Sequence, residues 1–441
     1  MLLNLLAKSI ISSPPYKRFD ITEPQLNFFW NTFLHLDKWT FSRFEHFEPK
    51  IMEKIQKQKL RDILRHAQKN TDYWKDLIPR NFISDPVETL KTLPVLTREM
   101  LKKNSPSVFV AKSIAVWRQE LIRTSGTTTN SPVIFYGDKI NFLRMESVIQ
   151  HILKLDFGDR LLRFNLPFPL FNPSSKYFGI NFALYGNKNA AKKILSKLLE
   201  LNITHLLGPT SNILRLAAIF RTQSISYPLK TIGVVGEHLL KKDRIFMQNI
   251  FRCPIYNIYA SKEASGPLAY ECDESNGWHM NMANFYWEIL DDDNNEVETG
   301  KDGNIILTML ESELMPFIRY KIGDRGRILS DSCPCGRKNP RLLFTGRDVQ
   351  FITLRSGHLL PLLSLVQLIR SSGPLIDQFQ FKQQKIGEIR VMLVPLQPIS
   401  NEALEKILST AYARYNKELD VHIDVVNKIP GKSVLFVKNI T

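Results

Sequence analysis

The chain has few cysteines and no long apolar run. Its 441 residues include only 4 cysteines. That is too few for a disulfide framework, and their grouping favours metal ligation in a reducing compartment. The best apolar stretch, Leu359 to Ile369, is interrupted by polar residues and is shorter than the roughly 20 residues of a transmembrane helix. The N-terminus also lacks the basic segment and long hydrophobic region of a signal peptide. We therefore expect a cytoplasmic protein without a transmembrane segment.

Positive charge, in contrast, is in excess. The chain has 59 Lys and Arg against 43 Asp and Glu, a net charge of +16. Such a balance suits anionic partners, among them nucleotides, coenzyme A, nucleic acid and acidic membrane surfaces. We find no basic stripe interleaved with aromatic residues and no nucleic-acid-binding motif, so we expect no nucleic-acid partner. A Walker A loop is also absent, because no Gly-Lys-Ser/Thr ending follows the Ser/Thr-rich segment described below.

The residue pattern changes twice along the chain. Up to about residue 110 it is mostly helical, with apolar residues at helical spacing between Lys57 and Ala67. Thr97 is placed to cap a short helix that begins at Arg98. From about 115 to 343, short β-branched runs such as Ile232 to Val235 alternate with helical stretches, which is typical of an α/β fold. The remainder combines strands with one amphipathic helix and predicts a small α+β domain.

A loop rich in hydroxyl groups precedes the strand expected at 133–136. It reads Arg123-Thr124-Ser125-Gly126-Thr127-Thr128-Thr129-Asn130-Ser131-Pro132. Hydroxyls and free backbone N–H groups around a flexible glycine are suited to wrapping polyphosphate oxygens. A Ser/Thr-rich surface turn has the same composition, and the loop alone does not decide between the two.

A second set of residue types fits a nucleotide site. An enzyme that uses ATP needs an aromatic surface for adenine, carboxylates for Mg²⁺ and for the ribose hydroxyls, and a cation near the phosphates. Each residue also has a plain structural reading, such as a core aromatic, a surface acid or a turn residue. The segments that supply these types are Gly236-Glu237, Tyr259-Ala260-Ser261-Lys262-Glu263, Arg319-Tyr320-Lys321-Ile322-Gly323-Asp324 and Gly346-Arg347.

In this order, and with a late Gly431-Lys432, the segments resemble the adenylate-forming superfamily. More narrowly, the chain resembles its phenylacetate-CoA ligase-like branch, which includes the CapK-like capsule-biosynthesis relatives. The resemblance runs from about Leu60 to the C-terminus and is most specific between Tyr259 and Glu288. It implies an α/β fold, with a large N-terminal adenylate-forming domain of mixed sheets and helices at 1–346. A small mobile α+β lid domain follows at 347–441.

The resemblance also assigns roles to individual residues. Glu263 would ligate Mg²⁺, and Lys432 would neutralise charge as a carboxylate attacks the α-phosphate of ATP. Asp324 would bind the ribose, and Arg347 would contact the nucleotide near the hinge. The phosphates would be held by Thr124, Ser125, Gly126, Thr127 and Thr128. The adenine would be bordered by Gly236 and Tyr259, and Glu237 and Ala260 would also belong to the cofactor-binding residues.

Two positions depart from the pattern of the family. The loop has Thr129 and Asn130 where the family usually has Gly-Lys, and the hinge has Gln350 where the family often has Asp. The first difference bears on phosphate binding and the second on rotation of the C-terminal domain.

Three cysteines and one histidine form a further candidate site. Cys272, His279, Cys333 and Cys335 are a complete tetrahedral donor set for structural Zn²⁺, and the tight Cys-x-Cys supplies two ligands from one turn. The spacing is unusual for zinc, and unligated thiols near the surface are the alternative. Some members of the resembling branch carry such a Cys/His site, so the resemblance implies bound Zn²⁺ here.

These features lead to one functional expectation and two alternatives. The resemblance implies ATP-dependent adenylation of a carboxylic acid with release of pyrophosphate, followed by acyl transfer to coenzyme A. The first alternative transfers the acyl group to an amine or hydroxyl acceptor in polysaccharide or natural-product biosynthesis. The second is a non-catalytic relative. The resemblance is also compatible with a homodimer.

Overall fold

The computed structural model describes most of the chain. The described residues are 36–80, 85–123, 133–164, 177–180, 190–347, 351–372, 376–396, 398–415, 417–427, 429 and 434–438. Within these ranges, no helix has both the length and the apolar character that crossing a lipid bilayer requires.

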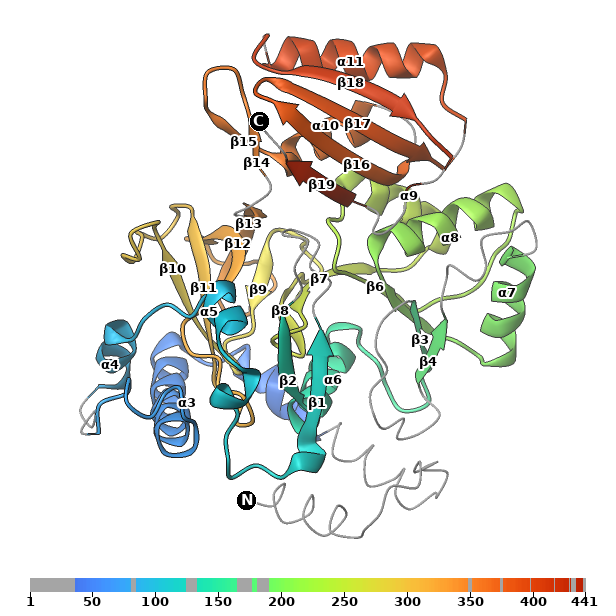
Figure 1. The fold of residues 1–441 in the computed structure, drawn as a ribbon. Helices are drawn as coiled ribbons and strands as arrows, with labels where there is room; N and C mark the ends of the chain where they lie inside the picture. Colours follow the sequence, from blue (N-terminus) through green and yellow to red (C-terminus); the bar gives the residue numbers. More distant parts are fainter. Residues whose placement is uncertain are drawn as a thin grey trace.

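One sheet of eleven strands forms the centre of the large N-terminal part (Figure 1). Its strands are antiparallel from one edge as far as the β8–β7 pair and parallel beyond it. In spatial order they are β10 (Phe285–Leu290), β11 (Gly303–Met309), β12 (Tyr320–Leu329), β13 (Arg341–Arg347), β9 (Trp278–Met280), β8 (Gly266–Tyr270), β7 (Ile255–Ser261), β6 (Thr231–Val235), β5 (His205–Gly208), β3 (Leu161–Phe164) and β4 (Tyr177–Ile180).

The parallel half of this sheet is covered on both faces. Successive residues of a strand point to opposite faces, and here they enter different apolar clusters. Leu206 packs in a cluster with three helices, one before it and two after it in the chain, whereas Leu207 packs in another cluster with an earlier helix. Burial on both faces explains why strands such as β6 are buried at every residue and mostly apolar. The helices are α6 (Lys139–Ile152), α7 (Ala190–Glu200), α8 (Thr210–Thr222) and α9 (Lys241–Phe251).

The N-terminal helical segment packs against the antiparallel half of the sheet. The helical residues predicted between Lys57 and Ala67 lie within a longer helix, whose buried apolar side chains join a core cluster with β8, β10, β11 and β12. Thr97 caps a helix that begins at Arg98, as the sequence predicts. The elements are α3 (Pro49–Asn70), α4 (Pro86–Thr92), α5 (Arg98–Lys103), the 3₁₀ turns η1 (Pro106–Phe109) and η2 (Val116–Arg118), and the hairpin of β1 (Gln119–Arg123) and β2 (Ile134–Asp138).

The C-terminal part has its own sheet and its own core. Four strands in the order β18-β17-β16-β19 share an apolar cluster with two helices, and Figure 1 shows this unit above the large sheet on the side of α8 and α9. The elements are β14 (Phe351–Thr353), β15 (Leu359–Pro361), α10 (Leu362–Ser372), β16 (Ile376–Lys385), β17 (Glu388–Pro395), α11 (Asn401–Tyr415), β18 (Asp420–Val425) and β19 (Val434–Lys438). The predicted fold class, a large mixed-sheet body with a small α+β domain, is confirmed.

Candidate nucleotide site and cysteine cluster

The structure brings Tyr259 and Asp324 together, although 65 positions separate them in the sequence. The Tyr259 hydroxyl donates a hydrogen bond of 2.6 Å to Oδ2 of Asp324, whose side chain is buried. The Tyr259 ring also stacks on Trp278, with 5.5 Å between centroids and 13° between planes. An aromatic ring and a carboxylate, each fixed by a neighbour, are thus held side by side.

This contact depends on curvature of the sheet. Three strands lie between β7 and β12, which in a flat sheet would place the two strands about 19 Å apart. The strand register shifts at Tyr259/Ala260 and again at Arg325/Gly326, next to the two contacting residues. Because such bulges bend a strand and increase its twist, the sheet folds over at this point.

Gly236 and Glu237 follow β6 at the same edge. Val235 pairs with Ile258 in the parallel register, so Gly236 lies beside the Tyr259 end of β7. Ligands of parallel α/β sheets bind at this carboxyl edge. Gly236 has φ of +77°, which a residue with a Cβ rarely adopts. The Glu237 carboxylate accepts hydrogen bonds from the backbone N and Oγ of Ser211, at 2.8 and 3.1 Å, and so caps α8.

Glu263 lies in the turn between β7 and β8 and is 7% exposed. Its Oε1 accepts a hydrogen bond of 3.2 Å from the Tyr320 hydroxyl and lies 3.4 Å from Nη2 of Arg98. Burial, together with the negative charge of Glu263, raises the pKa of Tyr320 well above its ordinary value. Tyr320 therefore remains a neutral donor to the carboxylate. The sequence did not reveal these roles of Tyr320 and Arg98, because neither residue is close to Glu263 along the chain.

Other predicted nucleotide contacts are described only in part or not at all. Thr124 to Thr128 and Lys432 lie outside the described residues, as do Thr129, Asn130 and Gln350. The backbone of Arg347 pairs with Asp324 across β13 and β12. The Nζ of Lys262 donates to the carbonyl oxygen of Arg123 at 3.2 Å. The last described residue before the hydroxyl-rich loop is therefore next to the turn that carries Glu263.

Cys272, His279, Cys333 and Cys335 form one cluster, with all four donor atoms within 4.8 Å of one another. The Sγ atoms of Cys272 and Cys333 are 3.6 Å apart, which is much longer than a disulfide bond of about 2.05 Å. His279 directs Nε2 toward Cys335 at 3.3 Å, while its Nδ1 faces the backbone oxygen of Asn339 at 3.2 Å. A backbone acceptor for Nδ1–H leaves Nε2 as the ligand atom, which is the usual arrangement at zinc.

The electrostatics of the cluster also fit a bound cation. Burial lowers the pKa of His279 to about 4, so the imidazole is neutral at pH 7 and able to coordinate. Burial also raises the pKa of Cys272 to about 12. A thiolate at this position therefore requires a nearby positive charge, which a metal ion would supply.

A buried carboxylate next to the cluster was not evident from the sequence. Oε2 of Glu45 accepts hydrogen bonds from Nε2 of His151 at 2.7 Å and from Nε of Arg337 at 3.0 Å. The backbone N of Lys338 donates to the carbonyl oxygen of Glu45 at 2.7 Å. These bonds tie the N-terminal helical segment to the turn that follows Cys335.

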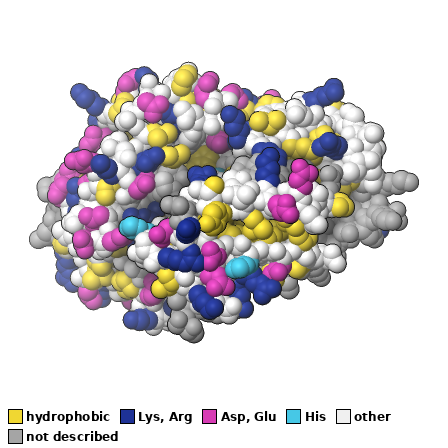
Figure 2. All heavy atoms as spheres, turned by 90° about the horizontal axis from the view of Figure 1, so that it is seen from above, with side chains coloured by type: hydrophobic (Ala, Val, Ile, Leu, Met, Phe, Trp, Pro, Cys, Tyr) yellow, Lys and Arg dark blue, Asp and Glu magenta, His cyan; other side chains and the backbone are white. Residues whose placement is uncertain are grey.

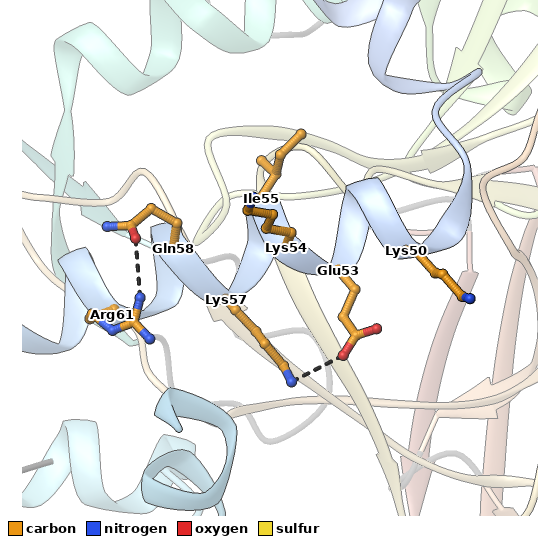
Figure 3. A pocket seen from close by; sticks show the side chains of 7 residues that line it. All are labelled: Lys50, Glu53, Lys54, Ile55, Lys57, Gln58 and Arg61. Carbon is orange, nitrogen blue, oxygen red and sulfur yellow. Dashed lines mark hydrogen bonds and ion pairs between the residues drawn. The ribbon is translucent and has the colours of Figure 1, made fainter. Parts of the chain in front are cut away.

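Two surface features lie apart from these sites. An open hollow of about 590 Å³ is lined only by residues of α3, among them Lys50, Lys54 and Arg61. Figure 3 shows these side chains along the helix. Because one helix supplies every lining residue and none belongs to the nucleotide cluster, we assign no function to it.

Figure 2, the view from above, shows Lys and Arg interspersed with Asp and Glu over that face. On this face the excess of positive charge is not gathered into one stripe.

Comparison with known proteins finds relatives of this chain. Residues 355–434 match the CapK C-terminal domain. Protein CapK of Staphylococcus aureus is 24% identical over 418 residues, which cover 88% of this chain and 89% of CapK. The phenylacetate-coenzyme A ligase of Thermus thermophilus is 29% identical over 161 residues, 35% of this chain and 36% of the ligase. This chain is a homologue of CapK and of the phenylacetate-coenzyme A ligases. It is thus related to enzymes of the adenylate-forming coenzyme A ligase family.

The solved structures agree with this assignment at the level of the fold. The homologue aligns with 2-hydroxyisobutyryl-CoA ligase in the postadenylation state with a TM-score of 0.72 and 17% identity, over 90% of this chain and 92% of the ligase. The same ligase in the thioesterification state gives a TM-score of 0.60, also over 90% of this chain. The fold is that of the adenylate-forming coenzyme A ligases.

Proposed function

We propose that this CapK homologue adenylates a carboxylic acid with ATP and then transfers the acyl group to coenzyme A. In the first step a carboxylate oxygen attacks the α-phosphorus, the bond to the β-phosphate breaks, and pyrophosphate leaves. In the second step the thiol sulfur attacks the acyl carbon and AMP leaves. The observation that carries the proposal is the Tyr259–Asp324 hydrogen bond at the carboxyl edge of the sheet, with Gly236 beside it.

The described residues divide the tasks of nucleotide binding. The Asp324 carboxylate, oriented by Tyr259, would accept the ribose hydroxyls, and the aromatic face of Tyr259 would border the adenine. The Glu237 carboxylate is engaged at α8, so its backbone would be the part nearest the base. The Tyr320 hydroxyl orients Glu263, which would ligate Mg²⁺. When bound, Mg²⁺ would neutralise charge on the phosphates. A solved protein of this fold was captured with ATP and a magnesium ion.

Family resemblance alone supports three further roles: Thr124 to Thr128 around the phosphates, Arg347 near the hinge and Lys432 as the late cation. The boundary between the two domains, at residues 346 and 347, is also proposed from this resemblance. Two observations support that boundary: the large sheet ends at Arg347, and the match to the CapK C-terminal domain begins at residue 355. An amine or hydroxyl acceptor is the alternative to coenzyme A in this proposal. The reason is that the sequence similarity covering most of the chain is to CapK rather than to a coenzyme A ligase.

The test of adenylation is carboxylate-dependent exchange of pyrophosphate into ATP. A panel of aryl, fatty and amino acids would be used with the intact protein, with Glu263→Ala and with Glu298→Ala. Glu298 is an exposed acid on a turn and serves as the matched control. We expect exchange with one class of acid, lost in Glu263→Ala and kept in Glu298→Ala. Absence of exchange with every acid, in folded protein, would contradict adenylation.

The acceptor is identified by product analysis. With the active acid and ATP, mass spectrometry would compare products with coenzyme A present and absent. An acyl-CoA thioester supports the proposed second step. An acyl-adenylate that persists with coenzyme A but disappears with an amine or hydroxyl compound would favour the second class.

We also propose that Cys272, His279, Cys333 and Cys335 hold a structural Zn²⁺. The compact donor set and the backbone bond to His279 support it. Elemental analysis of the purified protein is expected to give about one zinc per chain, and metal-free protein that is equally stable would contradict the proposal.

A further inference from the structure

Arg98 belongs to the N-terminal helical segment and forms an ion pair with Glu263. Among the described residues of that segment, no other cation does so. Arg98 comes from α5, 165 positions before Glu263, and its side chain is 24% exposed. The Tyr320 hydroxyl donates to the same carboxylate oxygen of Glu263, so the three side chains lie together. The Nε atom of Arg98 is buried and has no hydrogen-bond partner among the described residues. The donor capacity of Arg98 is therefore only partly used.

The backbone that carries Arg98 is firmly held. Leu96, two residues earlier, pairs with the strand at Tyr320, donating to the carbonyl oxygen of Arg319 and accepting from Lys321, each at 2.9 Å. Arg319 in turn donates to the carbonyl oxygen of Leu93 at 2.7 Å. Arg98 is thus positioned by the same strand that supplies Tyr320, and not by a surface loop.

The distance between Arg98 and Glu263 is too long for this ion pair alone to account for the position of Arg98. A charge-assisted hydrogen bond between a guanidinium and a carboxylate is typically about 2.7–2.9 Å, whereas Nη2 of Arg98 is 3.4 Å from Oε1 of Glu263. If Glu263 ligates Mg²⁺, the metal neutralises the carboxylate, and the guanidinium needs another anion. The phosphates bound by that metal are the anions next to it.

We propose that Arg98 binds the β- and γ-phosphates of ATP, beside Mg²⁺ on Glu263, and so holds the pyrophosphate that leaves on adenylation. This inference rests on the proposed function. A further observation supports it: residues 124–138, which follow Arg123 and include the rest of the hydroxyl-rich loop, contain no Lys or Arg. Beyond Arg123, that loop offers hydroxyls and N–H groups but no charge. The planar guanidinium of Arg98 supplies both charge and two parallel donors.

The test compares nucleotides that differ in the phosphates. Calorimetric titration of the full chain with ATP and Mg²⁺, and separately with AMP, would use the wild type, Arg98→Ala, Arg98→Lys and Lys102→Ala. Lys102 is an exposed cation on the same helix and is the matched control. Loss of Arg98 is expected to weaken ATP binding about 10- to 100-fold. AMP affinity is expected to stay the same, because AMP lacks the β- and γ-phosphates, and Arg98→Lys is expected to recover part of the loss.

Three other outcomes would overturn either this proposal or the proposed function. ATP affinity unchanged in Arg98→Ala would overturn the proposal, and so would an equal loss of ATP and AMP affinity, which indicates a structural role for the pair with Glu263. A wild-type protein that binds neither nucleotide would instead overturn the proposed function. Melting curves of the four proteins establish that each variant is folded.

Discussion

At the scale of single residues, the candidate site depends on contacts between distant parts of the chain. The Tyr259 hydroxyl donates to Asp324, 65 positions away, and both are residue types that an ATP site needs. Arg98 and Glu45 escaped prediction because their partners lie 165 and 292 positions away. Such contacts follow from strand order and packing, which residue types and local spacing do not encode.

The Tyr259 hydroxyl provides the first prediction at this scale. Tyr259→Phe keeps the ring that stacks on Trp278 but removes the donor that orients Asp324. Because one hydrogen bond to a charged acceptor is lost, we expect ATP affinity to fall about 3- to 30-fold, measured by calorimetry. Tyr286→Phe, on β10 away from the site, is the control. Equal ATP affinity in the two variants would show that Asp324 needs no help from Tyr259.

At the scale of elements, charged side chains join helices that are far apart in the sequence. Glu311, just after β11, accepts from Nζ of Lys59 on α3 at 2.5 Å and from Nη1 of Arg144 on α6 at 2.6 Å. The sequence indicated both helices from their apolar periodicity, and both are present. It did not indicate this connection, because periodicity gives the buried face of a helix and not the partner of an exposed charge.

The stability supplied by Glu311 is expected to depend on pH. Burial would raise the pKa of Glu311, but Lys59 and Arg144 outweigh it and hold the pKa below its ordinary value. A lowered pKa in the folded state stabilises the protein above the unfolded-state pKa of about 4.3, and this stabilisation is lost as the pH falls through the folded-state pKa. Glu311→Gln should therefore lower the free energy of unfolding by about 1–3 kcal/mol at pH 7.

Urea unfolding at a series of pH values would measure this difference. The gap between wild type and Glu311→Gln is expected to narrow below about pH 4 as the native carboxylate is protonated. Glu298→Gln, an exposed acid, should show no such gap. A difference that is constant from pH 7 to pH 3 would indicate lost packing instead of lost charge pairing.

The cysteine cluster joins two other elements, β9 and the turn before β13. Chelation of the proposed zinc is expected to lower the melting temperature, because buried donors then lose the cation that they share. Cys335→Ser should act in the same direction without chelator and reduce the zinc content. Cys253→Ser, at a buried thiol outside the cluster, should leave zinc content unchanged. Full zinc content in Cys335→Ser would remove Cys335 from the ligand set.

At the scale of the whole molecule, the fold class was predictable and the arrangement of its parts was not. The switch from β-branched runs to an α+β tail predicted a large body and a small domain, and both are observed. The order of eleven strands depends on pairings between segments far apart in the chain, which local patterns do not specify. The orientation of the C-terminal domain is likewise a property of its contacts with α8 and of Leu396 with the apolar cluster there.

That orientation leads to the last prediction. The homologue matches 2-hydroxyisobutyryl-CoA ligase better in the postadenylation state than in the thioesterification state, with TM-scores of 0.72 and 0.60, each over 90% of this chain. If coenzyme A is the acceptor, its binding should favour a second orientation of the C-terminal domain, in which the few contacts between β16 and α8 are exchanged for others.

Fluorophores attached at exposed positions 102 on α5 and 406 on α11 would report this change of orientation by energy transfer. Transfer should change when coenzyme A is added to protein carrying the acyl-adenylate, and ATP alone should not cause that change. A signal that coenzyme A leaves unaltered, in protein that forms the thioester, would mean that both half-reactions proceed in one arrangement of the domains.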